Sequence, residues 1–342
     1  MGFFLMTDMK LSPAQAQQHV ELRVGVPYAN LIAHQQRFVE ALGRHFQIDP
    51  AYILPTTGTT GAIEAVRNHI LKISKSREPV VYMLFPEYWR AKESFQGLGF
   101  QLREASIERE NFLIDEQNIV VEVQDILPDL LYFSLPNNPT GATFLPEKII
   151  EHIPEHTAII IDLTLPSADF DLQTILPTLH HRFAEKRSLF LVGSFSKSHR
   201  TAEHRVGWLI GSSLQQMKML REENRNVVST FAIQQGLQCL NQKSPAVESI
   251  KHSFAFLKEG EKQARYEIVR PSRMVESGYV LLKTLVDIDK LQFILQRENI
   301  HVMWGAELGL PNTYIRLETI ETANIKIFVD IVNKGFGEVE LH

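Results

Sequence analysis

Four short apolar runs in the first two thirds of the chain constrain its fold most strongly. They are VVYMLF at 80–85, LLYFSL at 130–135, TAIIIDL at 157–163 and SLFLVG at 188–193. Continuous apolar runs of this length are typical of strands that are covered on both faces, as in a parallel sheet between two helical layers. Helix-like segments such as 61–73 and 146–153 alternate with them. The pattern therefore predicts an α/β fold.

Polar or turn-forming residues stand at the end of each apolar run. They are Pro86 to Tyr88, Pro136 to Pro139, Asp162, and Ser196 with Lys197. In open α/β sheets, ligands bind in the crevice beyond the carboxyl ends of the strands. We therefore expect these four strand ends to line one cleft.

The last third of the chain has a different pattern. A long helical stretch is predicted at about 212–240. It is followed by strand-like runs at 277–285, 300–304 and 312–318 and by one helix at about 287–298. Short strands that flank a helix indicate a smaller α+β unit. We predict a large domain over residues 45–225 and a small domain built from both chain ends, residues 1–44 and 226–342.

The composition favours small-molecule chemistry in a globular protein. Of the 342 residues, 44% are hydrophobic, which is enough for one large or two moderate domains with a sizeable core. The formal charge of −5 comes from interspersed charges, so no basic surface for nucleic acid or an anionic membrane is predicted. The one cysteine, Cys239, permits no intramolecular disulfide, and the apolar opening MGFFLM is too short for a signal peptide. We expect a cytoplasmic protein.

Two common classes of site are not predicted. The histidines form no H-E-x-x-H pattern and the chain has no C-x-x-C pair, so we expect no metal site. There is no G-x-S-x-G elbow, which argues against an α/β hydrolase.

The segment PTTGTTGAIEAV, residues 55–66, places glycines and threonines directly before a predicted helix. A helix N-terminus offers unpaired backbone N–H groups and a partial positive charge, so Gly58 to Gly61 can hold a phosphate. The glycine spacing matches neither the P-loop nor the dinucleotide-binding pattern. An ordinary capped loop is the alternative.

Two strand ends carry single polar residues with a specific chemistry. In LPNNPTG, Asn138 is held rigid before Pro139 and can donate its amide to a ligand oxygen, although most such segments are plain turns. Asp162 ends the apolar run AIIID, and a buried carboxylate there requires a cationic or N–H partner. A helix cap or a structural ion pair is the alternative for Asp162.

Lys197 stands where the fourth apolar run breaks into Ser-Phe-Ser-Lys. Desolvation of an ammonium is costly and lowers its pKa from about 10.4 toward the range where the amine is nucleophilic, which favours Schiff-base chemistry. The alternative is a strand-end lysine whose ammonium reaches water. Arg205 follows eight residues later, before a strand-like run, and can bind a phosphate bidentately.

Taken in order, these motifs resemble the fold-type I pyridoxal-phosphate enzymes. The likeness is greatest to the class I and II aminotransferases, especially histidinol-phosphate-aminotransferase-like members, and extends from about Leu31 to Arg316. The resemblance implies the PLP-dependent transferase fold type I. This fold has a mainly parallel central sheet covered by helices and a smaller α+β domain.

The resemblance also implies a role for each motif residue at pyridoxal 5′-phosphate (PLP). The implied phosphate ligands are Thr59, Thr60, Ser194, Ser196 and Arg205. Tyr88 would stack on the pyridine ring, Asn138 would bond its 3-oxygen, and Asp162 would keep its nitrogen protonated. Lys197 would form the Schiff base with the cofactor and then move the proton at the substrate Cα.

Two further residues would contact the substrate. Arg316, in YIRL, matches the arginine that binds the α-carboxylate, for which a planar guanidinium is well suited. Tyr28 is a candidate for substrate contact and for the tyrosine that reaches the phosphate from a neighbouring subunit, although Val26-Pro27 aligns about as well. The resemblance therefore implies a homodimer that transfers the amino group of an α-amino acid to a 2-oxo acid.

The chain departs from the family pattern at two places. Where the family usually has Asp-x-Ala-Tyr, the segment DLTL places Leu165 at the tyrosine position, and Ala202-Glu203-His204 replaces the usual Ala-Gly before the second arginine. Leu165 leaves open an alternative reaction with the same cofactor, namely elimination, cyclisation or decarboxylation of an amino acid, as in capreomycidine synthase. A non-catalytic PLP-fold protein is a third hypothesis, which the joint presence of Lys197, Asp162, Asn138 and Arg316 disfavours.

Overall fold

The computed structural model describes residues 28–74, 78–107, 111–224 and 227–336. A seven-stranded sheet has the order β1-β7-β6-β5-β4-β2-β3. In chain order its strands are β1 (Ile53–Thr56), β2 (Val80–Phe85), β3 (Gln101–Ser106), β4 (Leu130–Ser134), β5 (Ala158–Asp162), β6 (Leu189–Ser194) and β7 (Gly207–Gly211). Strands β3, β2, β4, β5 and β6 pair in parallel, and β7 is antiparallel to both of its neighbours. The four predicted strands are confirmed as β2, β4, β5 and β6.

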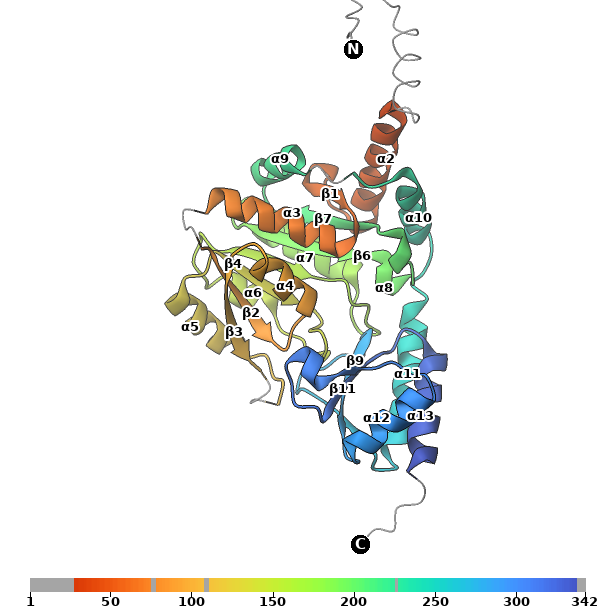
Figure 1. The fold of residues 1–342 in the computed structure, drawn as a ribbon. Helices are drawn as coiled ribbons and strands as arrows, with labels where there is room; N and C mark the ends of the chain where they lie inside the picture. Colours follow the sequence, from red (N-terminus) through yellow and green to blue (C-terminus); the bar gives the residue numbers. More distant parts are fainter. Residues whose placement is uncertain (1–27, 75–77, 108–110, 225–226, 337–342) are drawn as a thin grey trace, which may run out of the picture.

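Helices cover both faces of this sheet (Figure 1). On one face lie α2 (Tyr28–Phe46), α5 (Glu116–Ile126), α6 (Pro146–Ile150), α7 (Leu172–Phe183) and α10 (Thr230–Leu240). On the other face lie α3 (Gly58–Ile73), α4 (Trp89–Gln96) and α9 (Leu214–Glu223). Side chains of β4 alternate between the two cores, Leu131 and Phe133 in the first and Leu130 and Tyr132 in the second. This two-sided burial explains why the strands read as continuous apolar runs.

A smaller antiparallel sheet forms a second unit, at the bottom of Figure 1. Its strands, in the order β10-β11-β9-β8, are β10 (Met303–Trp304), β11 (Tyr314–Glu318), β9 (Tyr279–Thr284) and β8 (Tyr266–Ile268). Its own core includes residues of α11 (Ala246–Glu261), α12 (Ile288–Arg297) and α13 (Thr322–Gly335). These elements agree with the α+β pattern that the sequence predicts.

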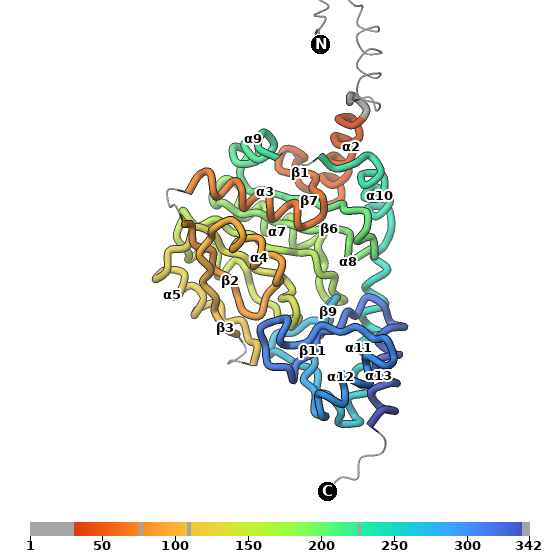
Figure 2. Tube along the Cα trace, viewed as in Figure 1, coloured from red at the N-terminus to blue at the C-terminus, as the bar shows by residue number. Residues whose placement is uncertain are grey.

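One predicted helix is wrong in extent. The stretch 212–240 contains two helices, α9 and α10, because Asn224 is extended and Ser229 caps a new helix. The Ser229 hydroxyl accepts a hydrogen bond from Ala232 N at 3.1 Å. Figure 2 shows the chain passing from α10 into α11 and so into the smaller unit.

The predicted domain boundaries stay a prediction. Phe38 and Leu42 of α2 and Ile233 of α10 belong to the core of the larger sheet. This packing favours a larger unit that includes both helices and a smaller unit that starts near α11.

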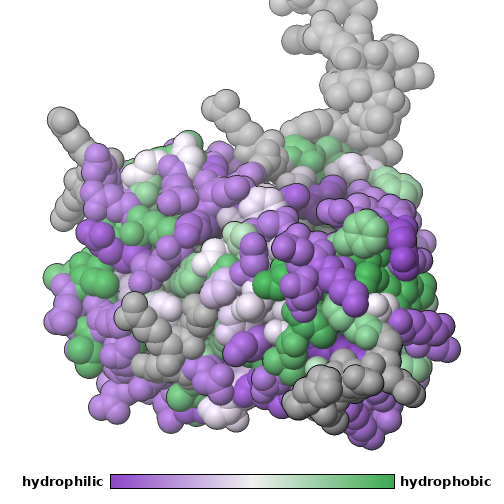
Figure 3. All heavy atoms as spheres, turned by 60° about the horizontal axis from the view of Figure 1, so that its bottom comes forward, coloured by the Kyte–Doolittle hydropathy of each residue, from purple (hydrophilic) through white to green (hydrophobic). Residues whose placement is uncertain are grey.

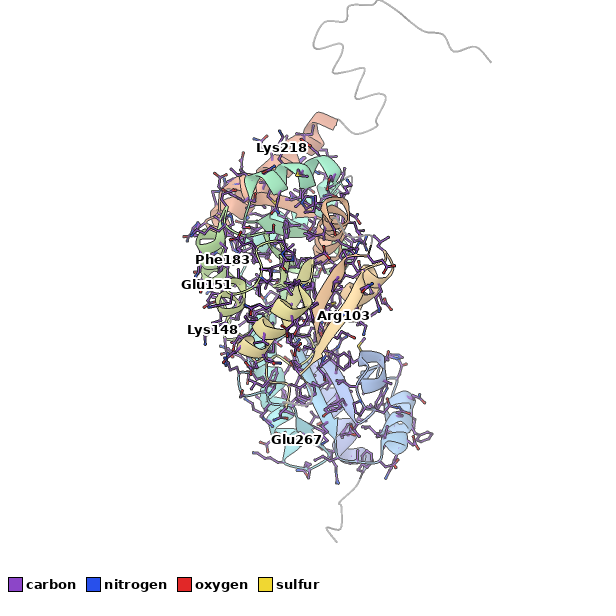
Figure 4. All side chains as sticks on the ribbon, turned by 90° about the vertical axis from the view of Figure 1, so that its left-hand side faces the viewer. Arg103, Lys148, Glu151, Phe183, Lys218 and Glu267 are labelled. Atoms are coloured by element: carbon purple, nitrogen blue, oxygen red, sulfur yellow. The ribbon has the colours of Figure 1, made fainter. Side chains whose placement is uncertain are left out.

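Each sheet has an edge strand that carries an exposed charged side chain. Figure 4 shows Arg103 on β3, one edge strand of the larger sheet, and Glu267 on β8, one edge strand of the smaller sheet, and both residues are exposed. Charged edges oppose pairing with another sheet.

Figure 3 shows the face of the molecule that lies at the bottom of Figure 1, where the smaller unit is. Hydrophilic and hydrophobic residues are mixed on this face. Among the described residues, none of the helices combines the length and the apolar character that a membrane span requires.

The close approach of β6 and β7 gives a stability prediction. A Cβ on Gly193 would lie 2.7 Å from Cη2 of the buried Trp208, whose ring also packs against Phe46. Gly193→Ala should lower the free energy of unfolding by about 1–3 kcal/mol, because the rigid indole cannot give way. Urea titration measures the loss.

Gly211→Ala is the matched control on the partner strand. Its Cβ would lie 2.9 Å from Cγ of Met217, a flexible side chain that can change rotamer. We expect a loss of less than about 1 kcal/mol. Equal losses in the two variants would contradict the role given to Trp208.

Candidate active site

A cavity of about 350 Å³ lies at the carboxyl ends of the parallel strands. Every predicted site residue except Tyr28 lines it: Thr59, Thr60, Tyr88, Asn138, Asp162, Ser194, Ser196, Lys197, Arg205 and Arg316. The four strand ends therefore meet in one cleft, as the sequence predicts, and β11 of the smaller unit contributes Arg316. The roles given to these residues stay predictions. Tyr28 is the first residue of α2, and its side chain, like Val26 and Pro27, lies outside the described residues.

The N-terminus of α3 and the Arg205 guanidinium lie together and form a positively charged site. The Arg205 guanidinium donates to the main-chain oxygens of Ala202 and Thr57, each at 3.2 Å, which holds it at the helix N-terminus. Gly58 has a φ of +72°, and a Cβ there would lie 2.7 Å from Arg205 Nη2. A glycine is therefore required for the close approach of helix and guanidinium. Free N–H groups and a guanidinium at one place suit a phosphate.

Asp162 is a buried carboxylate whose described partners are neutral. It accepts hydrogen bonds from Tyr132 Oη at 2.8 Å and Thr164 N at 2.9 Å. Burial raises the pKa of Asp162, and the hydrogen bonds from Thr164 and Tyr132 offset only part of that effect. A cation that binds beside this carboxylate would relieve the cost of its burial, which suits a protonated ring nitrogen.

Glu87 is a second buried carboxylate that the sequence analysis did not single out. Its oxygens accept hydrogen bonds from Tyr88 N at 2.8 Å, Ser134 N at 2.9 Å and the Ser134 hydroxyl. The same hydroxyl accepts from Asn138 N at 2.8 Å, so Glu87 ties the Tyr88 turn to the Asn138 loop. Burial raises the pKa of Glu87 to about 7, against the hydrogen bonds from Ser134 and Tyr88. Its position two residues after the buried strand β2 was the signal available.

Asn138 and Arg316 are in contact across the two units. Arg316 Nη1 donates to Asn138 Oδ1 at 3.3 Å. This contact leaves Nδ2 of Asn138 for the predicted hydrogen bond to a ligand oxygen. The Arg316 guanidinium also lies 4.2 Å from the ring centroid of Tyr279.

Lys197 lies at the junction of α8 (Phe195–Ser198) with the smaller sheet. Its Nζ pairs with a carboxylate oxygen of Glu318 and lies 5.2 Å from the ring centroid of Tyr279. Burial lowers the pKa of Lys197, as predicted, but Tyr279 and Glu318 outweigh burial, and the net shift is upward. The predicted low pKa is therefore wrong for the protein without a ligand.

Tyr279 and Glu318 were missed because neither belongs to a recognisable motif. The register of β9 and β11 places Glu318 opposite Tyr279. Arg90 and Trp89, at the start of α4, also line the cavity, with the guanidinium 5.0 Å from the indole centroid. Leu165 is 6% exposed and lines both this cavity and a neighbouring one of about 450 Å³. It presents an alkyl group where the resemblance implies a tyrosine.

Comparison with known proteins supports the resemblance. A sequence model of the family described as "Aminotransferase class I and II" matches residues 14–332. The histidinol-phosphate aminotransferase of Ruminiclostridium cellulolyticum is 25% identical over 174 residues, which cover 51% of this chain and 46% of that protein. The chain thus spans about half the length of the curated relatives it matches.

Solved structures show the same fold. The putative histidinol-phosphate aminotransferase of Erwinia carotovora atroseptica superposes with a TM-score of 0.74 at 18% identity, covering 94% of this chain and 91% of that one. The histidinol-phosphate aminotransferase of Sinorhizobium meliloti, solved in complex with pyridoxal 5′-phosphate, gives 0.72 at 16% identity, covering 94% and 87%. The predicted fold type I is confirmed.

The buried Glu87 gives a prediction for the pH dependence of stability. Its pKa is about 7 in the folded protein against 4.5 in the unfolded chain, so the folded state binds the proton more tightly. The stability that this proton contributes is fully present below pH 4.5 and is lost as the pH rises through 7. Relative to Glu87→Gln, the wild-type chain should lose about 3 kcal/mol of unfolding free energy across this window.

Denaturant titrations of both proteins from pH 4 to 8.5 measure this difference. An amide that fits the donors poorly adds a constant cost, whereas the prediction concerns the slope with pH. Glu93→Gln, on the exposed side of α4, controls for the loss of a glutamate charge. A difference between wild type and Glu87→Gln that stays constant with pH would contradict the prediction.

Proposed function

The chain belongs to the class I and II aminotransferase family, and on that premise we propose that it is a PLP-dependent aminotransferase. It would transfer the amino group of an α-amino acid to a 2-oxo acid. The observation that carries the proposal is the single cavity that joins Lys197, Asp162, Arg205 and Arg316. These four side chains match the amine, the ring nitrogen partner, the phosphate partner and the carboxylate partner that such a reaction requires.

The residues present fit the cofactor. The N-terminus of α3 and Arg205 suit the phosphate, and the absence of a Cβ at Gly58 leaves room for the Arg205 guanidinium beside this helix end. Asp162 is 5% exposed and has neutral partners, so a protonated pyridine nitrogen would compensate its charge. Tyr88 and Asn138 line the same cavity.

When bound, the cofactor supplies an electron-deficient ring that stabilises negative charge at the substrate Cα. Asp162 holds the proton on the ring nitrogen, because its buried carboxylate is stabilised by a cation at that position. Arg316 orients the substrate through two parallel hydrogen bonds to its carboxylate, for which a guanidinium has the right shape. Two contacts hold the Arg316 guanidinium in place: its hydrogen bond to Asn138 and its packing against the ring of Tyr279.

Lys197 has two tasks in this proposal. It holds the cofactor covalently through Nζ, and as a free amine it takes a proton from the substrate Cα and returns it. Its place at the end of β6, on the short helix α8, keeps Nζ in the same cavity as Arg316. An amine in the cavity that also holds the proposed carboxylate site suits proton transfer at the Cα of a bound α-amino acid.

Finer points of the proposal concern assembly and location. We propose a homodimer in the cytoplasm, with Tyr28 near the substrate or the phosphate of a neighbouring subunit. The family resemblance supports the dimer, and the single cysteine fits a reducing compartment.

Because of Leu165, we retain a second reaction as an alternative. Its alkyl side chain offers no hydroxyl at the edge of the cavity where the resemblance implies one. Elimination, cyclisation or decarboxylation of an amino acid uses the same cofactor. Product analysis separates the two, since transamination converts the cofactor to its amine form and releases a 2-oxo acid.

The attachment of the cofactor to Lys197 gives the first test. Borohydride reduction of the purified protein should leave a pyridoxyl group on the peptide that contains Lys197, as found by mass analysis. Lys197→Arg keeps the positive charge but cannot form the bond, and should carry no label. A label on another lysine, or bound cofactor without any label, would overturn the assignment.

The role of Arg316 gives a second test. Arg316→Ala should weaken the binding of the amino-acid substrate by about 2–5 kcal/mol, because a desolvated carboxylate loses its partner. The absorption spectrum of the cofactor without substrate should hardly change. Spectral titration with amino acids measures the affinity, and Arg297→Ala, on the exposed side of α12, is the control. Loss of cofactor with unchanged substrate affinity would mean that Arg316 has another role.

A further inference from the structure

Glu318 is the charged partner of Lys197. The Lys197 Nζ and a carboxylate oxygen of Glu318 form an ion pair, although the two residues are 121 positions apart and belong to different units. The Lys197 side chain is 26% exposed and that of Glu318 is 40% exposed. Lys197 lines the active-site cavity, and both residues line a neighbouring cavity of about 390 Å³ that Arg316 and Tyr279 share, where Glu318 stays partly exposed to solvent.

Strand geometry, rather than a flexible loop, positions Glu318. Ile315 and Leu317 of β11 pack into the smaller core, so the alternate residues Arg316 and Glu318 face the other side. The register with β9 places Glu318 opposite Tyr279, whose ring contacts both Lys197 and Arg316. Backbone pairing thus fixes a carboxylate beside the lysine amine.

The other charged groups around this amine have different partners. Asp162 accepts from Tyr132 and Thr164, Arg205 is held at the start of α3, and Arg316 is held by Asn138. The remaining titratable groups that line the cavities beside Lys197 are Tyr88, Arg90, Tyr279 and His301. Tyr279 and Glu318 act against burial and raise the pKa of Lys197. Glu318 is the carboxylate in direct contact with it.

We propose that Glu318 is a positioning residue that sets the protonation state of Lys197, an inference that rests on the proposed function of this lysine. An ammonium cannot attack a carbonyl. Nζ must first give its proton to solvent; it then adds to the aldehyde carbon of the cofactor, a C=N bond forms, and the carbonyl oxygen leaves as water. Glu318 stabilises the ammonium, so it moves this capture step to higher pH.

The test measures capture of PLP by Lys197 in the full chain freed of cofactor. Samples taken between pH 6 and 9.5 are quenched with borohydride, and the pyridoxyl label on the Lys197 peptide is quantified. At pH 7, Glu318→Gln should be labelled about twofold to fivefold faster than wild type, the range for a partly exposed ion pair. Both rates should rise with pH across this window, which lies below the raised pKa of Lys197, and Glu318→Gln should stay ahead of wild type throughout it.

Two variants sharpen the result. Glu318→Asp keeps the carboxylate on a shorter side chain and should give a profile between those of wild type and Glu318→Gln, so a shift remains measurable even if the glutamine variant folds poorly. Glu259→Gln removes an exposed lysine–glutamate pair on α11 and should match wild type. A merely structural role for Glu318 would change the amount of folded protein but not the labelling rate per folded chain at each pH.

The outcomes separate this inference from the proposed function. A wild-type chain without label on Lys197 would overturn the proposed function. A label on Lys197 with coincident pH profiles for wild type and Glu318→Gln would overturn the role of Glu318 alone.

Discussion

The site depends on one stretch of backbone, residues 273–278, which pairs with the loops that follow β4 and β5. Its main-chain hydrogen bonds join Arg273 O to Thr143 N at 2.6 Å, Val275 N to Gly141 O at 3.0 Å, Glu276 O to Ala168 N at 3.0 Å and Gly278 N to Pro166 O at 2.9 Å. These bonds tie the strand ends of the larger sheet to the start of β9. Because they are made by main-chain groups, they fix the distance between the two sheets whatever rotamers the side chains adopt.

With that distance fixed, the charges of the cavity can be matched in pairs. Lys197 and Arg316 enter from opposite units, and each meets a group of the other unit, Glu318 and Asn138 respectively. Buried carboxylates on the larger sheet, Asp162 and Glu87, are stabilised by neutral donors instead. A charge removed from water without such partners would shift its pKa until it became neutral. The neutral donors offset only part of this cost for Glu87 and Asp162, whose pKa values stay raised, whereas Lys197 is paired with an opposite charge.

How much of this the sequence predicts depends on whether a contact is local. The buried strands were predicted well because burial on both faces leaves continuous apolar runs, and strand ends gather at one edge whatever the loops do. The helix over 212–240 was predicted too long, since periodicity does not reveal a cap such as Ser229. Glu318 and Tyr279 were missed because their place depends on the register of an antiparallel pair. No spacing within the sequence fixes that register.

The geometry of β11 links the two ends of the proposed substrate site. Arg316 and Glu318 lie on the same face of the strand, about 7 Å apart along it. While Lys197 is an ammonium, it engages Glu318, and the guanidinium is left to Asn138 and Tyr279. When Lys197 loses its charge in the proposed reaction, Glu318 keeps a negative charge two residues from Arg316, the residue proposed to hold the substrate carboxylate. The role proposed for Glu318 therefore concerns both ends of the proposed substrate site, because one strand carries the carboxylate beside Lys197 and the guanidinium of Arg316.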